Sequence, residues 1–182
     1  MTVWILRLGH RLIRDSRTST HLLLVARAFG ANKVLYTGRV DKALEEKVQN
    51  IVDDWGGSFS IEYCSDWKIA VKEWKIKGGE IIHLTMYGLP IQKFIKKIRL
   101  SKKPKLVVVG GSKVPSEIYE IANWNISITS QPHSEISALS VFLHEFFEGK
   151  ELIKSFDGAK MKIKPQKRGK KIITNDEVKY PL

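Results

Sequence analysis

Apolar positions along the chain follow two patterns, short unbroken runs and longer amphipathic stretches of helical period. The unbroken runs have the length of strands, whereas the amphipathic stretches place their apolar residues on one face of a helix. Residues 41–55 give the clearest helix, which ends at Gly56-Gly57. One face of this helix carries Leu44, Val48, Ile51, Val52 and Trp55.

The two patterns alternate along the chain. They predict strands over residues 3–8, 33–37, 59–63, 80–86, 106–109 and 125–128, and helices over residues 18–29, 41–55, 66–77, 91–100, 115–123 and 134–148. This alternation is typical of an α/β fold with a mostly parallel sheet and helices on both faces. The run 106–109 is apolar at every position, as a central strand buried on both faces should be.

The length of 182 residues suits one domain with a sizeable core. We expect residues 1–149 to form that domain, because the last predicted helix ends at Gly149, and residues 150–182 to form a basic, partly ordered C-terminal extension. Residues 160–171 of the extension are rich in lysine, and residues 96–105 form a second basic run. Each run is either a solvated surface or a phosphate-binding one.

Lysine and arginine outnumber aspartate and glutamate by 31 to 19, which gives a formal net charge of +12. An excess of this size favours a nucleic-acid partner over an anionic membrane surface. Arg7 cuts the first apolar run too early for a signal peptide, and no apolar stretch approaches the ~20 residues of a membrane span. We therefore expect a soluble, cytoplasmic protein without a membrane partner.

Residues that carry chemistry by themselves are sparse. Cys64 is the one cysteine, which excludes an internal disulfide and a thiolate metal cluster and is more typical of a core thiol than of a nucleophile. The histidines show no zinc spacing, and neither a GxxxxGK[ST] nor a GxGxxG phosphate loop is present. We therefore expect no metal, and a bound cofactor that carries the chemistry.

Two loops rich in glycine and small polar residues follow strands in the C-terminal half. The first begins at Gly110 after the predicted strand 106–109, and the second covers residues 129–135 after the strand 125–128. Ligand sites of α/β folds lie at the carboxyl ends of strands, so we expect the two loops to form one pocket. Together with the basic charge, this pocket predicts a small-molecule cofactor that acts on a polyanion.

Several blocks of the sequence resemble one known family. They are Arg7-Leu8-Gly9-His10-Arg11, Arg14-Asp15, Arg17, Thr20-His21, Ala26-Arg27-Ala28-Phe29-Gly30-Ala31, His83-Leu84-Thr85-Met86-Tyr87-Gly88, Val109-Gly110-Gly111, Lys113-Val114-Pro115 and Ser130-Gln131-Pro132-His133-Ser134-Glu135. Through these blocks residues 3–149 resemble the archaeal tRNA ribose 2′-O-methyltransferases that modify the cytidine at position fifty-six of the T-loop. The last block is the most specific, and nothing beyond Gly149 contributes to the resemblance.

The resemblance implies a fold and a cofactor that the pattern alone does not give. The family belongs to the SPOUT superfamily, whose members are homodimers and bind S-adenosyl-L-methionine at a C-terminal trefoil knot. Ser112 and Ser130 depart from the family, in which we expect an acidic residue and an asparagine. Carried over to this chain, the cofactor-binding residues are Leu84, Gly110, Gly111, Ser112, Lys113, Val114, Ser130, Gln131, Pro132, His133, Ser134, Glu135, Ile136 and Ser137.

The same resemblance implies that an arginine of the N-terminal motif assists the ribose hydroxyl. The candidates are Arg11, Arg14, Arg17 and Arg27, and we favour Arg17 because it lies where loop becomes helix. A guanidinium is a poor base, so its expected role is to grip the phosphate beside the target ribose. Arg27 is equally well interpreted as an exposed helix residue, and His21 is a weaker alternative as proton acceptor.

These observations predict S-adenosylmethionine-dependent 2′-O-methylation of the cytidine at position fifty-six in the T-loop of tRNA, with tRNA as the partner. Two alternatives stay open. One is a SPOUT-class 2′-O-methyltransferase that acts on another RNA such as rRNA, and the other is a non-catalytic basic RNA-binding protein. Cofactor binding separates the second alternative from the enzymes, and methylation of tRNA separates the two enzymes.

Overall fold

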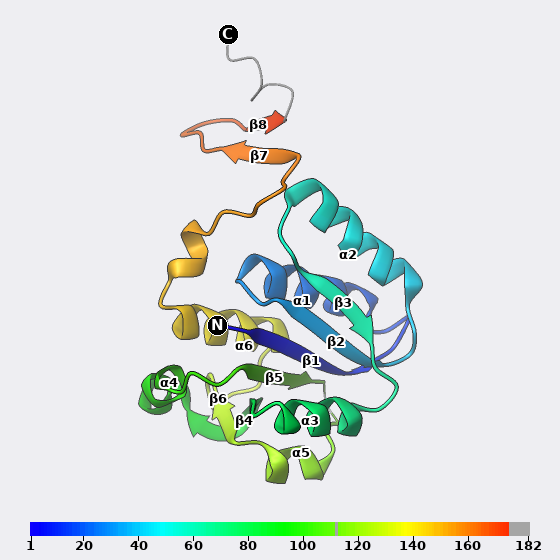
Figure 1. The fold of residues 1–182 in the computed structure, drawn as a ribbon, viewed down its shortest axis with the longest axis vertical. Coiled ribbons are helices and arrows are strands. Elements are labelled where there is room, and N and C mark those ends of the chain that lie inside the picture. The colour runs from blue at the N-terminus through cyan, green and yellow to red at the C-terminus, as the bar shows by residue number, and fades with distance from the viewer. Residues whose placement is uncertain (112, 175–182) are drawn as a thin grey trace.

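A six-stranded sheet forms the centre of the computed structural model, which describes residues 1–111 and 113–174 (Figure 1). All neighbouring strands run parallel, in the order β3-β2-β1-β5-β4-β6. The strands are β1 (Val3–His10), β2 (Lys33–Gly38), β3 (Ser60–Tyr63), β4 (Glu80–Pro90), β5 (Lys105–Gly110) and β6 (Trp124–Ser127). The predicted α/β class is confirmed, and this sheet is parallel throughout.

Helices cover both faces of the sheet, and each predicted helix is present with both ends within two residues of the prediction. Their starts have local causes: the Asp41 carboxylate accepts the backbone N–H of Leu44 at 2.9 Å, and the Ser134 hydroxyl accepts that of Ile136 at 3.1 Å. No helix in residues 1–111 or 113–174 is long and apolar enough to cross a membrane. One face of the sheet carries α1 (Ser16–Ala28), α2 (Lys42–Trp55), α4 (Ile91–Leu100) and α6 (Glu135–Phe147). The other face carries α3 (Trp67–Ile76) and α5 (Ser116–Ile121). The 3₁₀ turn η1 (Lys150–Ile153) follows α6.

The central strand β5 is buried on both faces, as its unbroken apolar run predicts. Val107 and Val109 pack into the core beneath α1, α4 and α6, whereas Leu106 and Val108 pack into the core beneath α3 and α5. None of these four side chains is more than 1% exposed. Successive residues of the strand therefore enter different cores, which leaves no position for a polar residue.

Strand β4 extends beyond its predicted end because its ladder with β6 is interrupted. Leu84 and Leu89 both pair with Ile126, so the residues between them bulge out of the ladder. A Cβ at Gly88 would meet the backbone nitrogen of Ile126 at 2.6 Å, so only glycine allows this approach of the two strands. The bulge projects residues 85–87 from the carboxyl-terminal part of β4.

Lys105, the last residue of the basic run 96–105, is fully buried. It pairs with Glu80 across the β4–β5 ladder, and its ammonium group contacts the Glu80 carboxylate and donates to the carbonyl oxygen of Ser101 at 3.0 Å. The interpretation of the run as a continuous exposed surface is therefore wrong at Lys105. A partly buried carboxylate on the neighbouring strand, which charge counting cannot reveal, accounts for the difference.

The C-terminal extension contains a hairpin that the sequence pattern did not predict. Strands β7 (Met161–Lys164) and β8 (Lys171–Thr174) pair in antiparallel fashion at the end of the molecule farthest from α5 (Figure 1). Each of these strands has four residues, and two of the four in β7 are lysines. An apolar and polar alternation of this length is too short to predict a strand. Residues 175–182 of the predicted extension lie outside the described residues.

Candidate functional site

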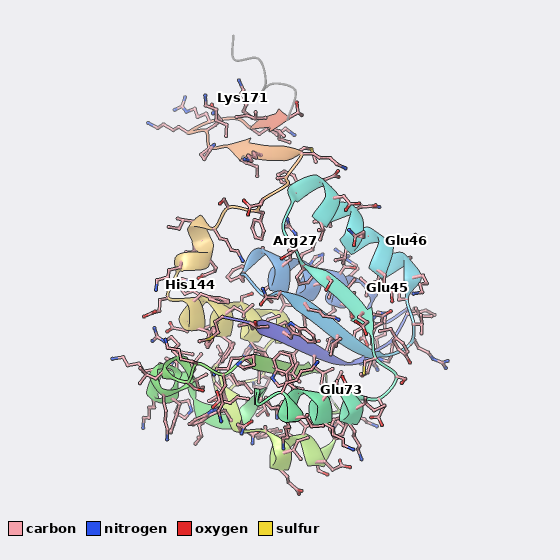
Figure 2. The ribbon with its side chains drawn as sticks, in the orientation of Figure 1. Arg27, Glu45, Glu46, Glu73, His144 and Lys171 are labelled. Atoms are coloured by element: carbon pink, nitrogen blue, oxygen red, sulfur yellow. The ribbon has the colours of Figure 1, made fainter. Side chains whose placement is uncertain are left out.

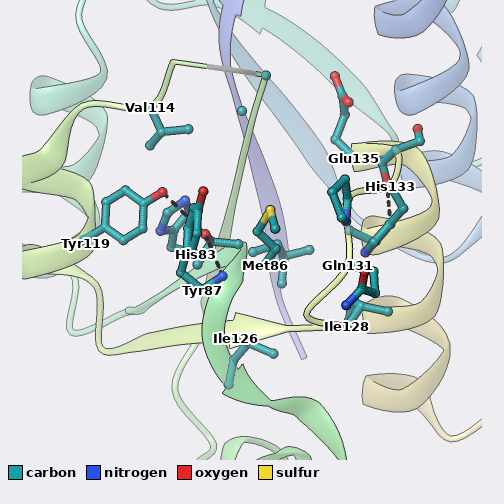
Figure 3. A pocket seen from close by; sticks show the side chains of 17 residues that line it. His83, Met86, Tyr87, Val114, Tyr119, Ile126, Ile128, Gln131, His133 and Glu135 are labelled. Carbon is teal, nitrogen blue, oxygen red and sulfur yellow. Dashed lines mark hydrogen bonds between the residues drawn. The ribbon is translucent and has the colours of Figure 1, made fainter.

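A cavity of about 480 Å³ opens at the carboxyl ends of β4, β5 and β6 (Figure 3). Its walls are the β4 bulge, the glycine loop after β5 and the loop from β6 into α6. Both predicted loops thus meet in one pocket, whose size suits a small molecule. The lining residues are His83, Leu84, Thr85, Met86, Tyr87, Gly110, Gly111, Val114, Tyr119, Ile126, Ile128, Gln131, Pro132, His133, Ser134, Glu135 and Ala138.

The glycine loop leaves its backbone open toward the cavity. Apart from its chain neighbours, no heavy atom of the described residues lies within 4 Å of a Cβ added at Gly111, whereas a Cβ at Gly110 would meet Cγ2 of Val114 at 2.5 Å. Gly110 therefore lets the loop fold back against Val114, and Gly111 leaves free space in front of its peptide groups. A ligand can approach these groups closely enough to form hydrogen bonds with them.

The β4 bulge brings Thr85, Met86 and Tyr87 to the cavity. The Thr85 hydroxyl accepts the backbone N–H of Tyr87 at 3.4 Å and lies at the same distance from the hydroxyl of Tyr119. The Tyr87 side chain is 78% exposed. The sequence analysis missed these three residues as site residues, and their place in the block that resembles the family was the available signal.

His83 is a fully buried lining residue with a defined tautomer. The side-chain amide of Asn125 donates to the carbonyl of Tyr119 at 2.7 Å, which turns its oxygen toward Nδ1 of His83, 2.9 Å away. Nδ1 therefore carries the proton, while Nε2 has no hydrogen-bond partner among the described residues. Burial lowers the pKa of His83, which favours the neutral imidazole, although the Asn125 bond raises the pKa in part.

Local hydrogen bonds fix the loop that leads into α6. The Thr129 hydroxyl accepts the backbone N–H of Gln131 at 3.2 Å, and the hydroxyl of Ser137 donates to the carbonyl of Ser134 at 3.1 Å. Ser134 also caps the helix, so the loop and the first turn of α6 form one ordered wall. Glu135 adds a carboxylate to this wall.

The arginine loop after β1, which carries Arg11 and Arg14 and leads to Arg17 in the first turn of α1, leaves the sheet next to the glycine loop, because Leu8 pairs with Gly110 across β1 and β5. Nε and Nη2 of Arg11 donate to the Asp15 carboxylate at 2.8 and 3.0 Å, and this bidentate bond lowers the pKa of Asp15. Arg14 and Arg17 are exposed. All three arginines lie at the same sheet edge as the cavity without lining it.

Arg7 is a site residue that the sequence analysis did not identify. Its side chain is 3% exposed, and its Nη2 lies 3.1 Å from Oε1 of Glu135 in the cavity wall. Nη1 donates to the carbonyl of Leu8 at 2.9 Å. Its place in the first block that resembles the family was the signal, but a strand residue gives no sign of a partner on a distant helix.

The interpretation of Arg27 as an exposed helix residue is wrong. Arg27 is 8% exposed, its Nη2 donates to the carbonyl of Gly56 at 2.7 Å, and its guanidinium lies 4.6 Å from the ring centroid of Phe156. It lies at the end of α1 that leads back to the amino end of β2, the edge of the sheet opposite the cavity. Arg27 therefore anchors the segment that follows η1 to the helices.

The structure brings most of the predicted cofactor-binding residues into one lining. Lys113, Ser130, Ile136 and Ser137 are chain neighbours of the lining without being part of it, and Ser112 lies outside the described residues. The described residues contain no group of His, Cys, Asp and Glu that could hold a metal ion. The predicted cofactor-binding residues that line the cavity are Leu84, Gly110, Gly111, Val114, Gln131, Pro132, His133, Ser134 and Glu135.

A sequence model of the family described as tRNA ribose 2′-O-methyltransferase, aTrm56, matches residues 55–173. The match includes all of the hairpin except its last residue, so the similarity extends past Gly149, where the sequence analysis ended it. The tRNA (cytidine(56)-2′-O)-methyltransferase of Methanosphaera stadtmanae is 48% identical over 174 residues, which cover 96% of this chain and 99% of that protein. The protein of the same name from Thermococcus kodakarensis is 48% identical over 172 residues, 93% of this chain and 95% of that protein.

Solved structures share the fold at low sequence identity. The TrmH/SpoU tRNA modifying enzyme of A. aeolicus has a TM-score of 0.59 and 16% identity, over 82% of this chain and 76% of that chain. The SpoU methyltransferase AviRb from Streptomyces viridochromogenes, in complex with the cofactor AdoMet, has a TM-score of 0.56 and 13% identity, over 81% of this chain and 57% of that chain. These similarities support the SPOUT-like fold.

Proposed function

The chain belongs to the tRNA ribose 2′-O-methyltransferase family described as aTrm56, and we propose that it methylates the ribose 2′-hydroxyl of cytidine 56 in tRNA with S-adenosyl-L-methionine as methyl donor. The observation that carries the proposal is the position of the arginine loop. This loop leaves the sheet beside the cavity, in which the backbone of the glycine loop is open at Gly111. A cofactor pocket and an RNA-facing cationic loop are thus adjacent. The net charge of +12 suits the polyanionic substrate.

The cavity is suited to S-adenosylmethionine in its size and lining. Leu84, Val114, Ile126 and Ile128 give it an apolar side that would enclose the adenosine. The open backbone at Gly111 would form hydrogen bonds with an adenine edge, because the part of the chain that the structure describes leaves the space around an added Cβ free to 4 Å, chain neighbours aside. This combination of apolar side chains and free peptide groups supports the assignment of the cofactor.

The chain itself must align two reactants and accommodate one proton. When bound, S-adenosylmethionine supplies a methyl group that is already activated. Arg14, exposed in the loop after β1, and Arg17, exposed in the first turn of α1, would grip the phosphate next to the target ribose, and their charge favours the alkoxide form of the hydroxyl. Arg11 is held by Asp15, so its role is to order the loop.

Exposed apolar residues in the arginine loop support the predicted homodimer. Leu12 and Ile13 are 48% and 98% exposed. Neighbouring apolar side chains on a surface favour a protein partner. We infer that these residues contact a second subunit close to the cavity, while the knot and the cytoplasmic location stay predictions.

Transfer of a labelled methyl group to tRNA transcripts tests the proposal. A transcript with cytidine at position 56 should accept the label, and the same transcript with 2′-deoxycytidine there should not, because it lacks the hydroxyl that is methylated. Methyl transfer to rRNA but not to tRNA would show that the substrate is another RNA. RNA binding without any methyl transfer would identify a non-catalytic RNA-binding protein.

A further inference from the structure

The hairpin β7–β8 has two chemically different faces. Its register places Lys164 directly opposite Lys171 and Ile163 directly opposite Ile172. Because side chains alternate along a strand, Lys162, Lys164 and Lys171 share one face with Ile173, which lies opposite Lys162, and Ile163 and Ile172 share the other face. The lysine face is thus a product of the register and not only of composition.

The charge of the hairpin is almost uncompensated. Residues 160–174 contain seven lysines and arginines and no acidic residue. Within residues 1–111 and 113–174, the one carboxylate that pairs with this segment is Asp54, whose Oδ1 lies 3.9 Å from Nζ of Lys160. Like charges directly opposite each other, as at Lys164 and Lys171, destabilise a hairpin that is already marginally stable with two strands.

Despite this repulsion, the hairpin is attached to the body at a defined place. Arg27 stacks on Phe156 and donates to the carbonyl of Gly56, and the backbone N–H of Gly57 donates to the carbonyl of Asp157 at 2.7 Å. A Cβ at Gly56 would meet that same carbonyl oxygen at 2.5 Å, so glycine is needed for the close contact. Figure 1 shows the hairpin beyond the C-terminal end of α2, and Figure 2 shows Lys171 on the strand that lies farther from the sheet.

We propose that the lysine face of this hairpin is an RNA-binding arm that holds backbone phosphates of tRNA away from the catalytic cavity. The inference rests on the proposed function for the identity of the RNA. A bound phosphate backbone removes the repulsion between Lys164 and Lys171, which the protein alone leaves in place. The arm contributes no residue to the cavity lining, so it acts on RNA affinity and not on cofactor binding.

The test is a triple variant, K162Q/K164Q/K171Q, which removes the charge of the face and keeps the side-chain length. The matched control is K72Q/K75Q/K77Q, at or just after helix α3, where all three lysines are exposed and the same charge is lost. Binding of a tRNA transcript is measured between about 50 and 300 mM salt. Each lost phosphate contact should lower the salt slope by ~0.7–0.9, which for three contacts weakens binding at 50 mM salt by roughly tenfold or more.

The outcomes separate this inference from the proposed function. The arm is supported if its triple variant has the flatter slope and a raised KM for tRNA, with unchanged S-adenosylmethionine affinity, while the control keeps the wild-type slope. Equal slopes for the wild type and the arm variant overturn it, and a change of oligomeric mass at an unchanged slope assigns the hairpin to an interface between copies instead. If the wild type binds tRNA through the arm but transfers no methyl group, the proposed function fails and the arm stands.

Discussion

Arg7 and Glu135 form an ion pair that joins the first strand, β1, to helix α6 at the edge of the cavity. Nη2 of Arg7 lies 3.1 Å from Oε1 of Glu135, and the arginine side chain is 3% exposed. Burial lowers the pKa of Arg7, and the charge of Glu135 opposes that shift. The pair links β1, which leads into the arginine loop, to the first turn of α6, which lines the cavity.

Glu135→Gln should destabilise the protein, because it leaves the guanidinium of Arg7 buried without its counter-charge. Glu135 is 23% exposed, so we expect a loss of about 1–3 kcal/mol in the free energy of unfolding, below the cost for a fully buried pair. Denaturant unfolding measures this loss. The double variant Arg7→Met/Glu135→Gln should be less destabilised than the sum of the single variants, and strict additivity would show that the two residues do not interact.

Gly111→Val should abolish or strongly weaken S-adenosylmethionine binding in a folded protein. Its chain neighbours aside, no atom of residues 1–111 or 113–174 lies within 4 Å of a Cβ added at Gly111, so the new side chain occupies room that the ligand needs. A steric cost of about 1–3 kcal/mol corresponds to a roughly 5- to 150-fold weaker affinity by calorimetry. Gly111→Ala should have a smaller effect, and unchanged affinity in a folded valine variant would place the cofactor elsewhere.

Arg17→Ala should reduce methyl transfer by about 100-fold at unchanged cofactor affinity, since its proposed contact is with the RNA phosphate. Arg17 is exposed, so the substitution leaves the core intact. Arg17→Lys should recover part of the turnover, because it restores charge without the bidentate grip. Near-normal turnover of the alanine variant would move the role to Arg14.

The fold could be predicted from the sequence because its signals are local. The apolar run 106–109 identifies the doubly buried strand, and Asp41 and Ser134 mark helix starts through hydrogen bonds within three residues. The glycine-rich loops were also predictable, since they follow strands directly. For Gly111, a glycine after a strand was enough to predict open backbone at the cavity.

The features that escaped prediction depend on partners far apart in sequence. Composition predicts that charged residues such as Lys105 and Arg27 lie on the surface. Both side chains are buried instead, Lys105 in contact with Glu80 and Arg27 against the ring of Phe156. Arg7 joins the site only through Glu135, and the β4 bulge exists only because two leucines pair with one residue of β6. Periodicity describes which face a residue occupies, and it contains no information about these pairings.

His83 should make the stability of the protein fall as the pH drops below about 6.5. In the folded state burial lowers its pKa, whereas in the unfolded chain the imidazole titrates near its usual value of about 6.5. Below that pH the unfolded state binds a proton that the folded state does not, so the free energy of unfolding decreases until the pH reaches the folded pKa. The full difference of one proton corresponds to ~1.4 kcal/mol per pH unit.

His83→Gln isolates this contribution, because a glutamine amide can still donate to Asn125 but does not titrate. Unfolding measured between pH 5 and pH 7.5 (a range of roughly one pH unit or more on each side of the usual histidine pKa) should show a weaker pH dependence in the variant than in the wild type. The exposed His21 is the control, since His21→Gln removes a histidine without removing a buried one and should leave the wild-type slope in place. Equal pH slopes for the His83→Gln variant and the wild type would mean that the folded protein accepts the proton at His83, which is incompatible with a neutral imidazole held between Asn125 and the cavity.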